Sequence, residues 1–222
     1  MDILSLIFPT NCLGCGKAAS LICHDCFNKS PRANQICIYC KRYSFMGNTH
    51  PSCLKNNSID GIFAPFAYDG VVRKAILALK YRFVSDIAQE LATHFANYLK
   101  KSNYPIKSAI VTPVPLHHKR ENWRGFNQSR KICGKIAEIM HWQFIPDLLV
   151  KAVSTKPQVG LKGDARRENV KNVFSLNTDH RPLNTNYIIF DDVATTGSTL
   201  IEAGRVLKKS GVPKVWGLTI AK

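Results

Sequence analysis

The sequence predicts an α/β protein in which a parallel sheet is flanked by helices and preceded by a small cysteine-rich domain. Seven of the eight cysteines lie before residue 60. From Gly61 onward, helical periodicity alternates with short apolar runs, which is typical of a parallel sheet with crossover helices. The 222 residues are also enough to bury a hydrophobic core without disulfides. We therefore expect two domains, 1–60 and 61–222.

The composition excludes several classes of protein. Hydrophobic residues make up 45% of the chain and charged residues 21%, which argues against a disordered protein. No apolar run approaches the ~20 residues of a membrane-spanning helix, and the opening segment lacks the basic start of a signal peptide and contains Pro9. We expect a soluble, cytoplasmic protein. The net charge of +16 favours polyanionic partners, such as nucleic acid or phosphorylated ligands.

The clustered cysteines form regularly spaced pairs. Three Cys-x-x-Cys motifs are followed by one His-x-x-Cys motif, which gives eight candidate metal ligands: Cys12, Cys15, Cys23, Cys26, Cys37, Cys40, His50 and Cys53. Each motif places two ligands on one side of a tight turn, and two turns supply the four tetrahedral ligands of zinc. The spacing predicts two zinc ions. A sequential pairing of the motifs is the simplest, and an interleaved, cross-braced pairing stays open.

Two other uses of these cysteines have less support. Disulfides need an oxidising compartment, and seven clustered cysteines cannot all pair with one another. A redox Cys-x-x-Cys motif normally opens a helix in a βαβ unit, which this segment does not resemble. With every coordination position filled by protein, the zinc ions are expected to be structural. The segment would then be a zinc-ribbon-like domain that folds around its metal.

The other residues able to bind metal are not expected to do so. His24 lies inside a motif whose cysteines already serve as ligands, and His117 and His118 lie in a basic loop. Cys133 lies in a helical apolar pattern with Ile132 and Ile136, so we expect a buried, inert thiol.

The rest of the chain divides into helices and strands in a regular order. Apolar spacing, capping residues and Gly or Pro stops predict helices over 71–81, 86–101, 128–140 and 199–210. Short apolar runs predict strands over 109–112, 173–176, 187–190 and 215–220, with a further apolar stretch over 148–153 and a basic segment over 154–172. In a parallel α/β sheet, ligands bind at the carboxyl ends of the strands.

The most informative stretch is IIFDDVATTGST, residues 188–199. Its apolar start predicts a buried strand, so Asp191 and Asp192 should emerge at the carboxyl end, where ligands bind. Adjacent carboxylates are costly to bury without hydrogen-bond donors, and a sugar diol can donate one hydroxyl to each. We expect Asp191 and Asp192 to bind a ribose and, in a catalytic domain, to stabilise positive charge that develops on it.

The residues that follow the two acids predict a phosphate site. They are small and mostly hydroxylated, and they lead into a helix N-terminus, where exposed N–H groups and the helix dipole favour a dianion. The expected contacts come from Val193, Ala194, Thr195, Thr196, Gly197, Ser198 and Thr199. No lysine follows Gly197, so this is not a Walker A loop. The acids and the loop together predict a ribose-5-phosphate site.

This stretch resembles the phosphoribosyl pyrophosphate signature of the type I phosphoribosyltransferases. In that signature, apolar residues precede two acids and a Thr-Thr-Gly-x-Thr-like loop. Two further segments resemble the diagnostic blocks of the ComF family: VTPVPLHHKRENWRGFNQS (111–129) and TKPQVGLKGDARRENVKNVF (155–174). In that family a cysteine-rich zinc element precedes a type I phosphoribosyltransferase-like domain, and the resemblance covers nearly the whole chain. His50 is one departure, because relatives carry another cysteine there, but imidazole also suits zinc.

The resemblance implies roles for basic residues outside the signature. The loop after Pro113 would bind pyrophosphate, with Arg120 and Arg124 gripping its oxygens in bidentate fashion. Lys156 lies in the segment that resembles the family's mobile loop and would reach the same ligand. Further basic candidates are Lys80, Lys119, Arg166 and Arg167.

The resemblance also implies a function in natural competence. We expect a protein that binds phosphoribosyl pyrophosphate with Mg²⁺ and supports DNA uptake in natural transformation. It would handle single-stranded DNA, together with a helicase-like partner. The alternative is an active phosphoribosyltransferase, a glycosyltransferase that passes ribose 5-phosphate to an acceptor in nucleotide metabolism. Whether the domain catalyses this reaction stays open, because no residue identifies an acceptor site.

The distribution of charge is compatible with DNA binding. Residues 100–171 contain fifteen Lys+Arg and five Asp+Glu, interleaved with the aromatic residues Tyr104, Trp123, Phe126, Trp142 and Phe144. A cationic groove with stacking aromatics binds single strands without reading their sequence. The alternative is that most of these aromatics belong to the hydrophobic core.

Overall fold

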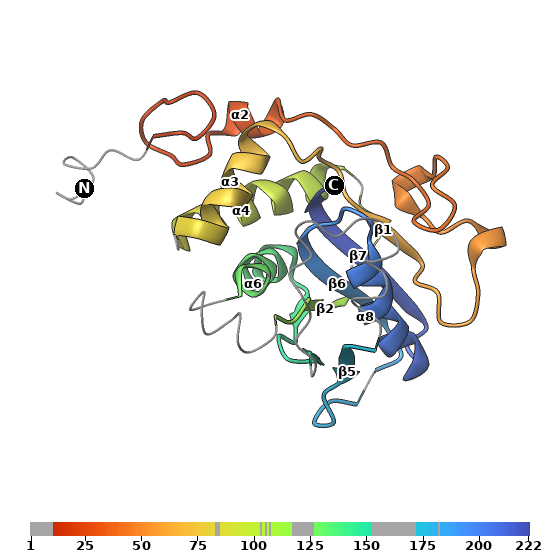
Figure 1. Ribbon diagram of the computed structural model, residues 1–222. Helices are drawn as coiled ribbons and strands as arrows, with labels where there is room; N and C mark the ends of the chain where they lie inside the picture. Colours follow the sequence, from red (N-terminus) through yellow and green to blue (C-terminus); the bar gives the residue numbers. More distant parts are fainter. Residues whose placement is uncertain are drawn as a thin grey trace.

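A computed structural model gives the fold of the chain. It describes residues 11–82, 85–102, 104, 106, 108–116, 127–151, 172–181 and 183–222. Figure 1 shows a central sheet with helices on both faces and the N-terminal segment running along one side of it. Among the described residues, no helix combines the length and the apolar character needed to span a bilayer.

Within the described part of the chain, the central sheet has five strands: β1 (Gly61–Phe63), β2 (Ile110–Pro113), β3 (Gln143–Phe144), β6 (Asn186–Val193) and β7 (Lys214–Ala221). They lie in the order β1-β7-β6-β2-β3, and each neighbouring pair is parallel. The carboxyl ends of all five strands therefore meet at one edge of the sheet. Two further strands, β4 (Leu149–Lys151) and β5 (Phe174–Leu176), form a separate antiparallel pair.

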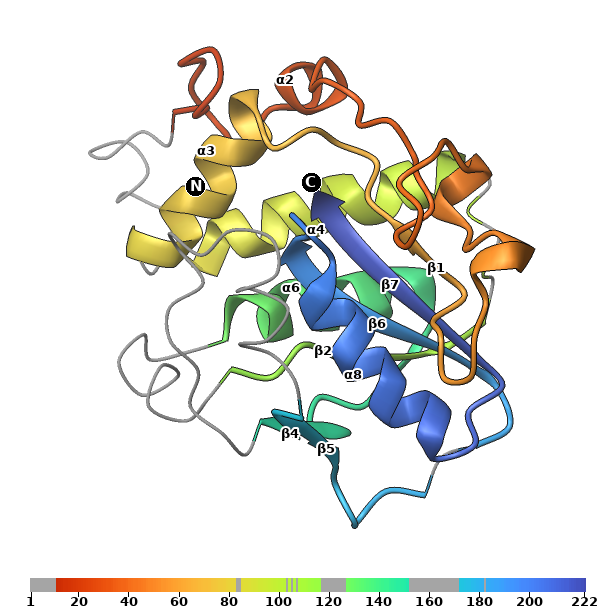
Figure 2. The same cartoon turned by 45° about the vertical axis from the view of Figure 1, so that its right-hand side comes forward.

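Helices cover both faces of the sheet, which explains why its central strands are continuously apolar. Three of them, α3 (Gly70–Arg82), α4 (Ser85–Lys101) and α6 (Gln128–Met140), lie on one face. On the other face, α8 (Ser198–Lys209) lies across β6 and β7 (Figure 2).

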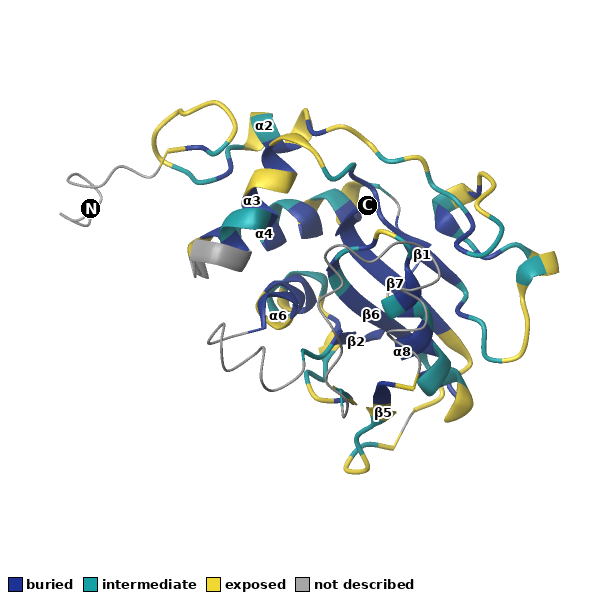
Figure 3. Ribbon diagram, viewed as in Figure 1, coloured by how far each residue is buried: buried dark blue, intermediate teal, exposed yellow. Residues whose placement is uncertain are grey.

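Alternate residues of β6 enter two separate cores. Ile188 and Phe190 join the cluster that contains the apolar sides of α3, α4 and α6. Tyr187 and Ile189 join the cluster that contains α8, β4 and β5. All four side chains are at most 1% exposed, and Figure 3 shows β6 and β7 as the most continuously buried part of the fold. The end of β6 is therefore a rigid platform.

Over its described residues, 11–60, the N-terminal segment has little regular structure and is attached to the rest at several points. It contains the short helix α2 (His24–Asn28) and the 3₁₀ turns η1 (Phe45–Gly47) and η2 (Pro51–Cys53). The Glu90 carboxylate on α4 accepts hydrogen bonds from the backbone N–H groups of Leu21 (3.1 Å) and Ile22 (2.6 Å). Ile38 and Ile59 are buried in the same cluster as α8. The segment therefore shares its apolar core with the sheet.

The predicted helices are confirmed, with ends that differ by one residue or none. The carboxyl end of the strand predicted over 187–190 was wrong, because β6 does not stop at Phe190. Asp191 pairs with Thr219 and Val193 with Ala221 on β7, so the strand continues through both acids. The strands β1 and β3 were not predicted, since three and two residues are too short to show a periodicity.

Candidate ligand site and metal sites

The two acids lie where β6 ends and are held by the N-terminus of α6. Asp192 is 5% exposed, and Asp191 is half-buried. Ser129 Oγ donates to Asp191 Oδ1 at 3.1 Å, and Gln128 Nε2 donates to Asp192 Oδ2 at 3.4 Å. The backbone N–H groups of Asp192 and Val193 also donate to these carboxylates, at 2.9 and 2.8 Å. Burial of the pair is thus offset by four hydrogen bonds, which also fix its orientation.

Asn127 joins three of the elements that surround the acids. Its side-chain oxygen accepts from the backbone N–H of Arg130 at 3.2 Å and so caps α6. Its amide nitrogen donates to the carbonyl of Val114 at 3.2 Å, just beyond β2. The N–H of Val114 in turn donates to the carbonyl of Phe190 on β6 at 2.8 Å. The start of the predicted pyrophosphate loop is therefore attached to the acid pair.

The predicted phosphate loop connects the acids to α8. Gly197 is the N-cap residue of α8 and has a φ of +74°. Thr196 Oγ1 lies 2.9 Å from Ser198 Oγ and accepts from the Ser198 backbone N–H at 3.3 Å. A small pocket of about 40 Å³ opens here. It is lined by Asp191, Val193, Ala194, Thr195, Thr196, Gly197, Thr199 and Leu200. Asp191 and most of the predicted loop residues thus line one pocket, whereas Asp192 and Ser198 are buried beside it and do not line it.

Gly197 also fits closely against the N-terminal segment. A Cβ atom at this position would lie 2.5 Å from Cδ1 of Ile38 and 3.0 Å from Cδ1 of Ile62. Lys41 Nζ donates to the carbonyl oxygen of Thr196 at 3.4 Å. The turn that contains Cys37 and Cys40 therefore rests directly on the phosphate loop.

Several predicted site residues lie outside the described residues. These are Arg120, Arg124 and Lys156, together with Lys119, Arg166, Arg167, His117, His118, Trp123 and Phe126. The side chain of Lys80 is not described either.

The eight predicted metal ligands form two compact groups. Cys12, Cys15, Cys23 and Cys26 make one group, and Cys37, Cys40, His50 and Cys53 make the other. Within each group all ligand atoms lie within 4.8 Å of one another, and every cysteine is a free thiol. Ligands of a tetrahedral Zn²⁺ with Zn–S bonds of ~2.3 Å lie about 3.8 Å apart, and Cys15 Sγ and Cys23 Sγ are 3.7 Å apart. Both groups could hold structural zinc, in the sequential pairing.

His50 is oriented as a metal ligand through its Nδ1 atom. Nδ1 lies 3.2 Å from Cys40 Sγ, while Nε2 lies 3.0 Å from the backbone carbonyl of Tyr43. A carbonyl at Nε2 fixes the hydrogen on that nitrogen and leaves the Nδ1 lone pair for a metal, as is common for ligating histidines.

Backbone and side-chain donors favour the thiolate form at one cysteine of each group. Burial opposes ionisation of Cys12, but N–H groups of Cys23, Cys15 and Gly14 lower the pKa of its thiol to about 6. Hydrogen bonds from the backbone and side chain of Arg42 lower the pKa of Cys40 to about 6. In contrast, the neighbouring thiols of Cys23 and Cys15 raise the pKa of Cys26 to about 12. A dication at the centre of each group would favour the thiolates throughout.

The aromatic residues proposed for base stacking are partly core residues. Tyr104 is 1% exposed and Trp142 is 6% exposed, so neither can stack on a nucleic-acid base. The most exposed large hydrophobic side chains of the described residues are instead Tyr43 at 74% and Phe45 at 72%, both beside the second metal group. Cys133 is fully buried, as predicted, and burial raises the pKa of its thiol.

Sequence reasoning missed the residues that support the site. A capping residue, Asn127, precedes the predicted helix over 128–140. It could have drawn attention to itself and to the first two helical residues, Gln128 and Ser129. No local sequence pattern could have indicated the role of Ile38 and Lys41, because the residues that they contact in the loop are more than 150 positions away. Lys41 and Thr196, for example, are 155 positions apart in the sequence.

The fold and these sites define a phosphoribosyltransferase-like α/β protein with a cysteine-rich element that could hold zinc. No family model matches the chain. It is 41% identical over 117 residues to "Competence protein F" of Haemophilus influenzae, covering 50% of each chain. It is 34% identical over 110 residues to "DNA utilization protein YhgH" of Escherichia coli strain K12, covering 49% of this chain and 48% of that one.

A third relative is similar over a longer stretch. "Competence protein ComFC" of Bacillus subtilis is 24% identical over 203 residues, which cover 88% of this chain and 81% of the relative. For the first two relatives, the matched part spans only about half of their length. These similarities support the resemblance to the ComF family that the sequence predicted.

Proposed function

We propose that the chain binds phosphoribosyl pyrophosphate with Mg²⁺ at the carboxyl end of β6. The observation that carries this proposal is the convergence of Asp191 and Asp192 with a hydroxyl-rich loop at the N-terminus of α8. The two carboxylates would accept hydrogen bonds from the ribose hydroxyls, and the loop would bind the 5-phosphate through N–H and hydroxyl donors.

The pyrophosphate would lie over the loop that follows β2. Val114 is tied to both β6 and α6, so this loop starts close to the acids. Arg120 and Arg124 are the residues we propose for its oxygens, and Lys156 would approach from the segment resembling the mobile loop. Mg²⁺ would be held mainly by pyrophosphate and ribose oxygens, since this ion keeps most of its coordination outside the protein.

Calorimetric titration with phosphoribosyl pyrophosphate and Mg²⁺ tests this proposal. The double variant Asp191→Asn and Asp192→Asn should bind at least about tenfold more weakly, because hydrogen bonds to charged acceptors are worth ~1.5–3 kcal/mol. Asp179→Asn, at an exposed acid of the β5–β6 connection, is the matched control and should bind like the parent. Equal affinity of the double variant and the parent would refute the proposal.

We further propose a role in DNA uptake during natural transformation, through the handling of single-stranded DNA. The names of the relatives, which refer to competence and DNA utilization, support this role. A helicase-like competence protein is the partner that we propose. The protein would act in the cytoplasm, where an incoming strand arrives.

We propose that the DNA contact lies on the second metal-binding element, because two of the aromatics predicted to stack on bases, Tyr104 and Trp142, are buried. Tyr43 and Phe45 are largely exposed there, and Lys41, Arg42 and Lys55 belong to the same element. Figure 3 displays the exposed turns of this element beside β1. Exposed rings beside cations bind single strands by stacking and by neutralising phosphates.

Fluorescence anisotropy with a labelled oligothymidine tests the DNA contact. Tyr43→Ala with Phe45→Ala should weaken binding by about tenfold, because stacking of each base is worth ~1–3 kcal/mol. Leu183→Ala removes another exposed hydrophobic side chain, distant in sequence, and should leave binding unchanged. Affinity should also fall steeply with salt. Salt-independent binding, or equal losses in the two variants, would count against this surface.

Phosphoribosyl transfer is the second candidate function. It is favoured by a pocket that adjoins the phosphate loop and could receive an acceptor. Release of pyrophosphate across a panel of nucleobases, with the Asp191→Asn and Asp192→Asn variant as control, tests for catalysis. Release that needs both the acids and one particular base would establish an enzyme, whereas no release with any base would favour a binding module.

A further inference from the structure

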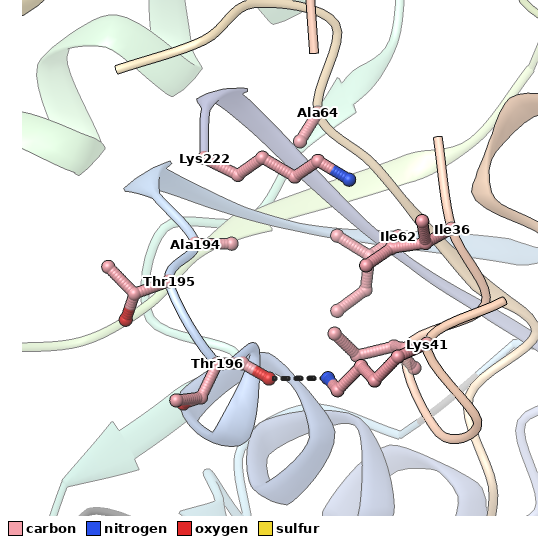
Figure 4. A pocket seen from close by; sticks show the side chains of 9 residues that line it. Ile36, Lys41, Ile62, Ala64, Ala194, Thr195, Thr196 and Lys222 are labelled. Atoms are coloured by element: carbon pink, nitrogen blue, oxygen red, sulfur yellow. Dashed lines mark hydrogen bonds between the residues drawn. The ribbon is translucent and has the colours of Figure 1, made fainter. Parts of the chain in front are cut away.

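A second pocket lies between the cysteine-rich segment and the phosphate loop. It has a volume of about 200 Å³ and is formed by three stretches of the chain that are far apart in the sequence, together with Lys222. The turn around Cys37 and Cys40 supplies one wall, residues 62–64 a second, and residues 194–196 a third (Figure 4). The pocket therefore shares Ala194, Thr195 and Thr196 with the phosphate loop.

Two amines extend into this pocket. Figure 4 shows the two side chains entering from different segments: the Lys41 amine ends at the carbonyl oxygen of Thr196, and the Lys222 side chain lies between Ala64 and Ala194. Among the described residues that line the pocket, none is acidic. The backbone of Lys222 is paired with Phe66 and Tyr68, so this residue is fixed in place while its side chain enters the pocket. Burial, and secondarily the charge of Lys41, lower the pKa of the Lys222 amine.

The remaining walls of the pocket are mostly apolar. They come from Ile36, Ile38, Ile62 and Ala64. Lys41 is exposed and donates to the Thr196 carbonyl, whereas Lys222 is partly buried. The two positive charges repel each other, and an anion held between them would offset that repulsion. A small ligand site typically combines apolar walls with a few convergent polar groups, as this pocket does. Its size suits a compact molecule and not a polymer.

We propose that this pocket binds a small organic anion, with its charge at Lys41 and Lys222 and its apolar body against the isoleucines. The metal-binding turn would then form part of a ligand site, because Ile38 and Lys41 flank Cys40. The same pocket would receive the acceptor of phosphoribosyl transfer, so the inference rests on that second candidate function and names the chemical class of its acceptor. It does not require that phosphoribosyl pyrophosphate is bound. It would place a second ligand directly beside the sugar phosphate.

Ring carboxylates and their amides provide matched probes of this pocket. Nicotinate and nicotinamide share one ring and differ in charge, as do benzoate and benzamide. In calorimetric or ligand-observed NMR titrations of the zinc-loaded protein, each carboxylate should bind at least about tenfold more tightly than its amide. Lys222→Met should reduce carboxylate binding by about the same factor, and so should Lys41→Met. Lys214→Met, at the exposed opposite end of β7, should have no effect.

The possible results separate this proposal from the others. Equal binding of acid and amide, absence of binding by both acids, or insensitivity to Lys222→Met would overturn it. Inorganic phosphate that binds to the two lysines as tightly as the ring acids would refute the apolar part of the site. The Asp191→Asn and Asp192→Asn variant should still bind the carboxylates, so a failure at the phosphoribosyl pyrophosphate site is recognised separately.

Discussion

At the scale of single residues, the acids are buried at a strand end and held by neighbours that come from one helix. Asp192 is nearly inaccessible to solvent. The side chains of Gln128 and Ser129 and two backbone N–H groups donate hydrogen bonds to the two carboxylates and fix their orientation. This arrangement fixes the acceptors before a ligand arrives, which reduces the entropy lost on binding. The sequence predicted the acids and the loop, but the donors on α6 became visible only in the folded chain.

Gly197 offers a direct test of the contact between the loop and the metal-binding turn. Gly197→Ala should lower the stability of the protein through two effects, a strained φ and a clash with Ile38. Gly211 also has a positive φ, of +91°, but its position is open, so Gly211→Ala isolates the backbone strain. In urea denaturation Gly197→Ala should cost at least ~1 kcal/mol more than Gly211→Ala. Equal losses would mean that Ile38 does not press on the loop.

At the scale of elements, the N-terminal segment depends on contacts with α4 and on its metal groups. Of its described residues, 11–60, only five form an α-helix, so backbone hydrogen bonding in that stretch is not enough to hold it. Glu90 supplies two acceptors to the segment, and the cysteines supply two groups that could hold zinc. These two sources of order can be removed one at a time.

Removal of zinc should unfold the cysteine-rich segment before the sheet. Metal binding and folding are coupled in small metal-bound elements, because the unfolded segment has no preformed site. After chelation, limited proteolysis should cut within residues 11–60 and leave the fragment that carries the sheet. Purified protein without zinc, or a segment that resists protease after chelation, would contradict the metal assignment.

Glu90→Gln should loosen the attachment of this segment to α4. The amide keeps one oxygen acceptor but places a donor against one of two backbone N–H groups, which costs ~1–3 kcal/mol. Glu138→Gln, at an exposed acid that pairs with Lys135, is the control and should change the free energy of unfolding by less than ~1 kcal/mol. Similar losses in both variants would show that the Glu90 contact does not stabilise the fold.

A comparison of individual elements shows which parts of the fold the sequence could predict. The helix over 128–140 was predicted with the bounds that the structure shows, because its apolar spacing is a local signal. The strand β6 was ended too early, since its extension through Asp191 depends on pairing with β7. Tyr104 and Trp142 were candidates for stacking because hydrophobicity alone does not distinguish a buried ring from an exposed one.

At the scale of the whole molecule, the cysteine-rich segment borders the candidate ligand site. Its second metal group exposes Tyr43 and Phe45 on one side and places Ile38 and Lys41 against the phosphate loop on another. Residues 1–60 carry only six Lys+Arg and three Asp+Glu, so most of the positive charge belongs to the rest of the chain. We propose that polyanion and sugar-phosphate ligands meet at this junction.

Hydrogen exchange with and without phosphoribosyl pyrophosphate and Mg²⁺ tests the central claim most directly. The account predicts that the ligand slows exchange of the backbone amides in residues 191–199, because the loop N–H groups donate to the 5-phosphate. It also predicts that the Asp191→Asn and Asp192→Asn variant loses this protection at the same ligand concentration. Unchanged exchange in residues 191–199 at saturating ligand, or protection confined to other segments, would contradict it.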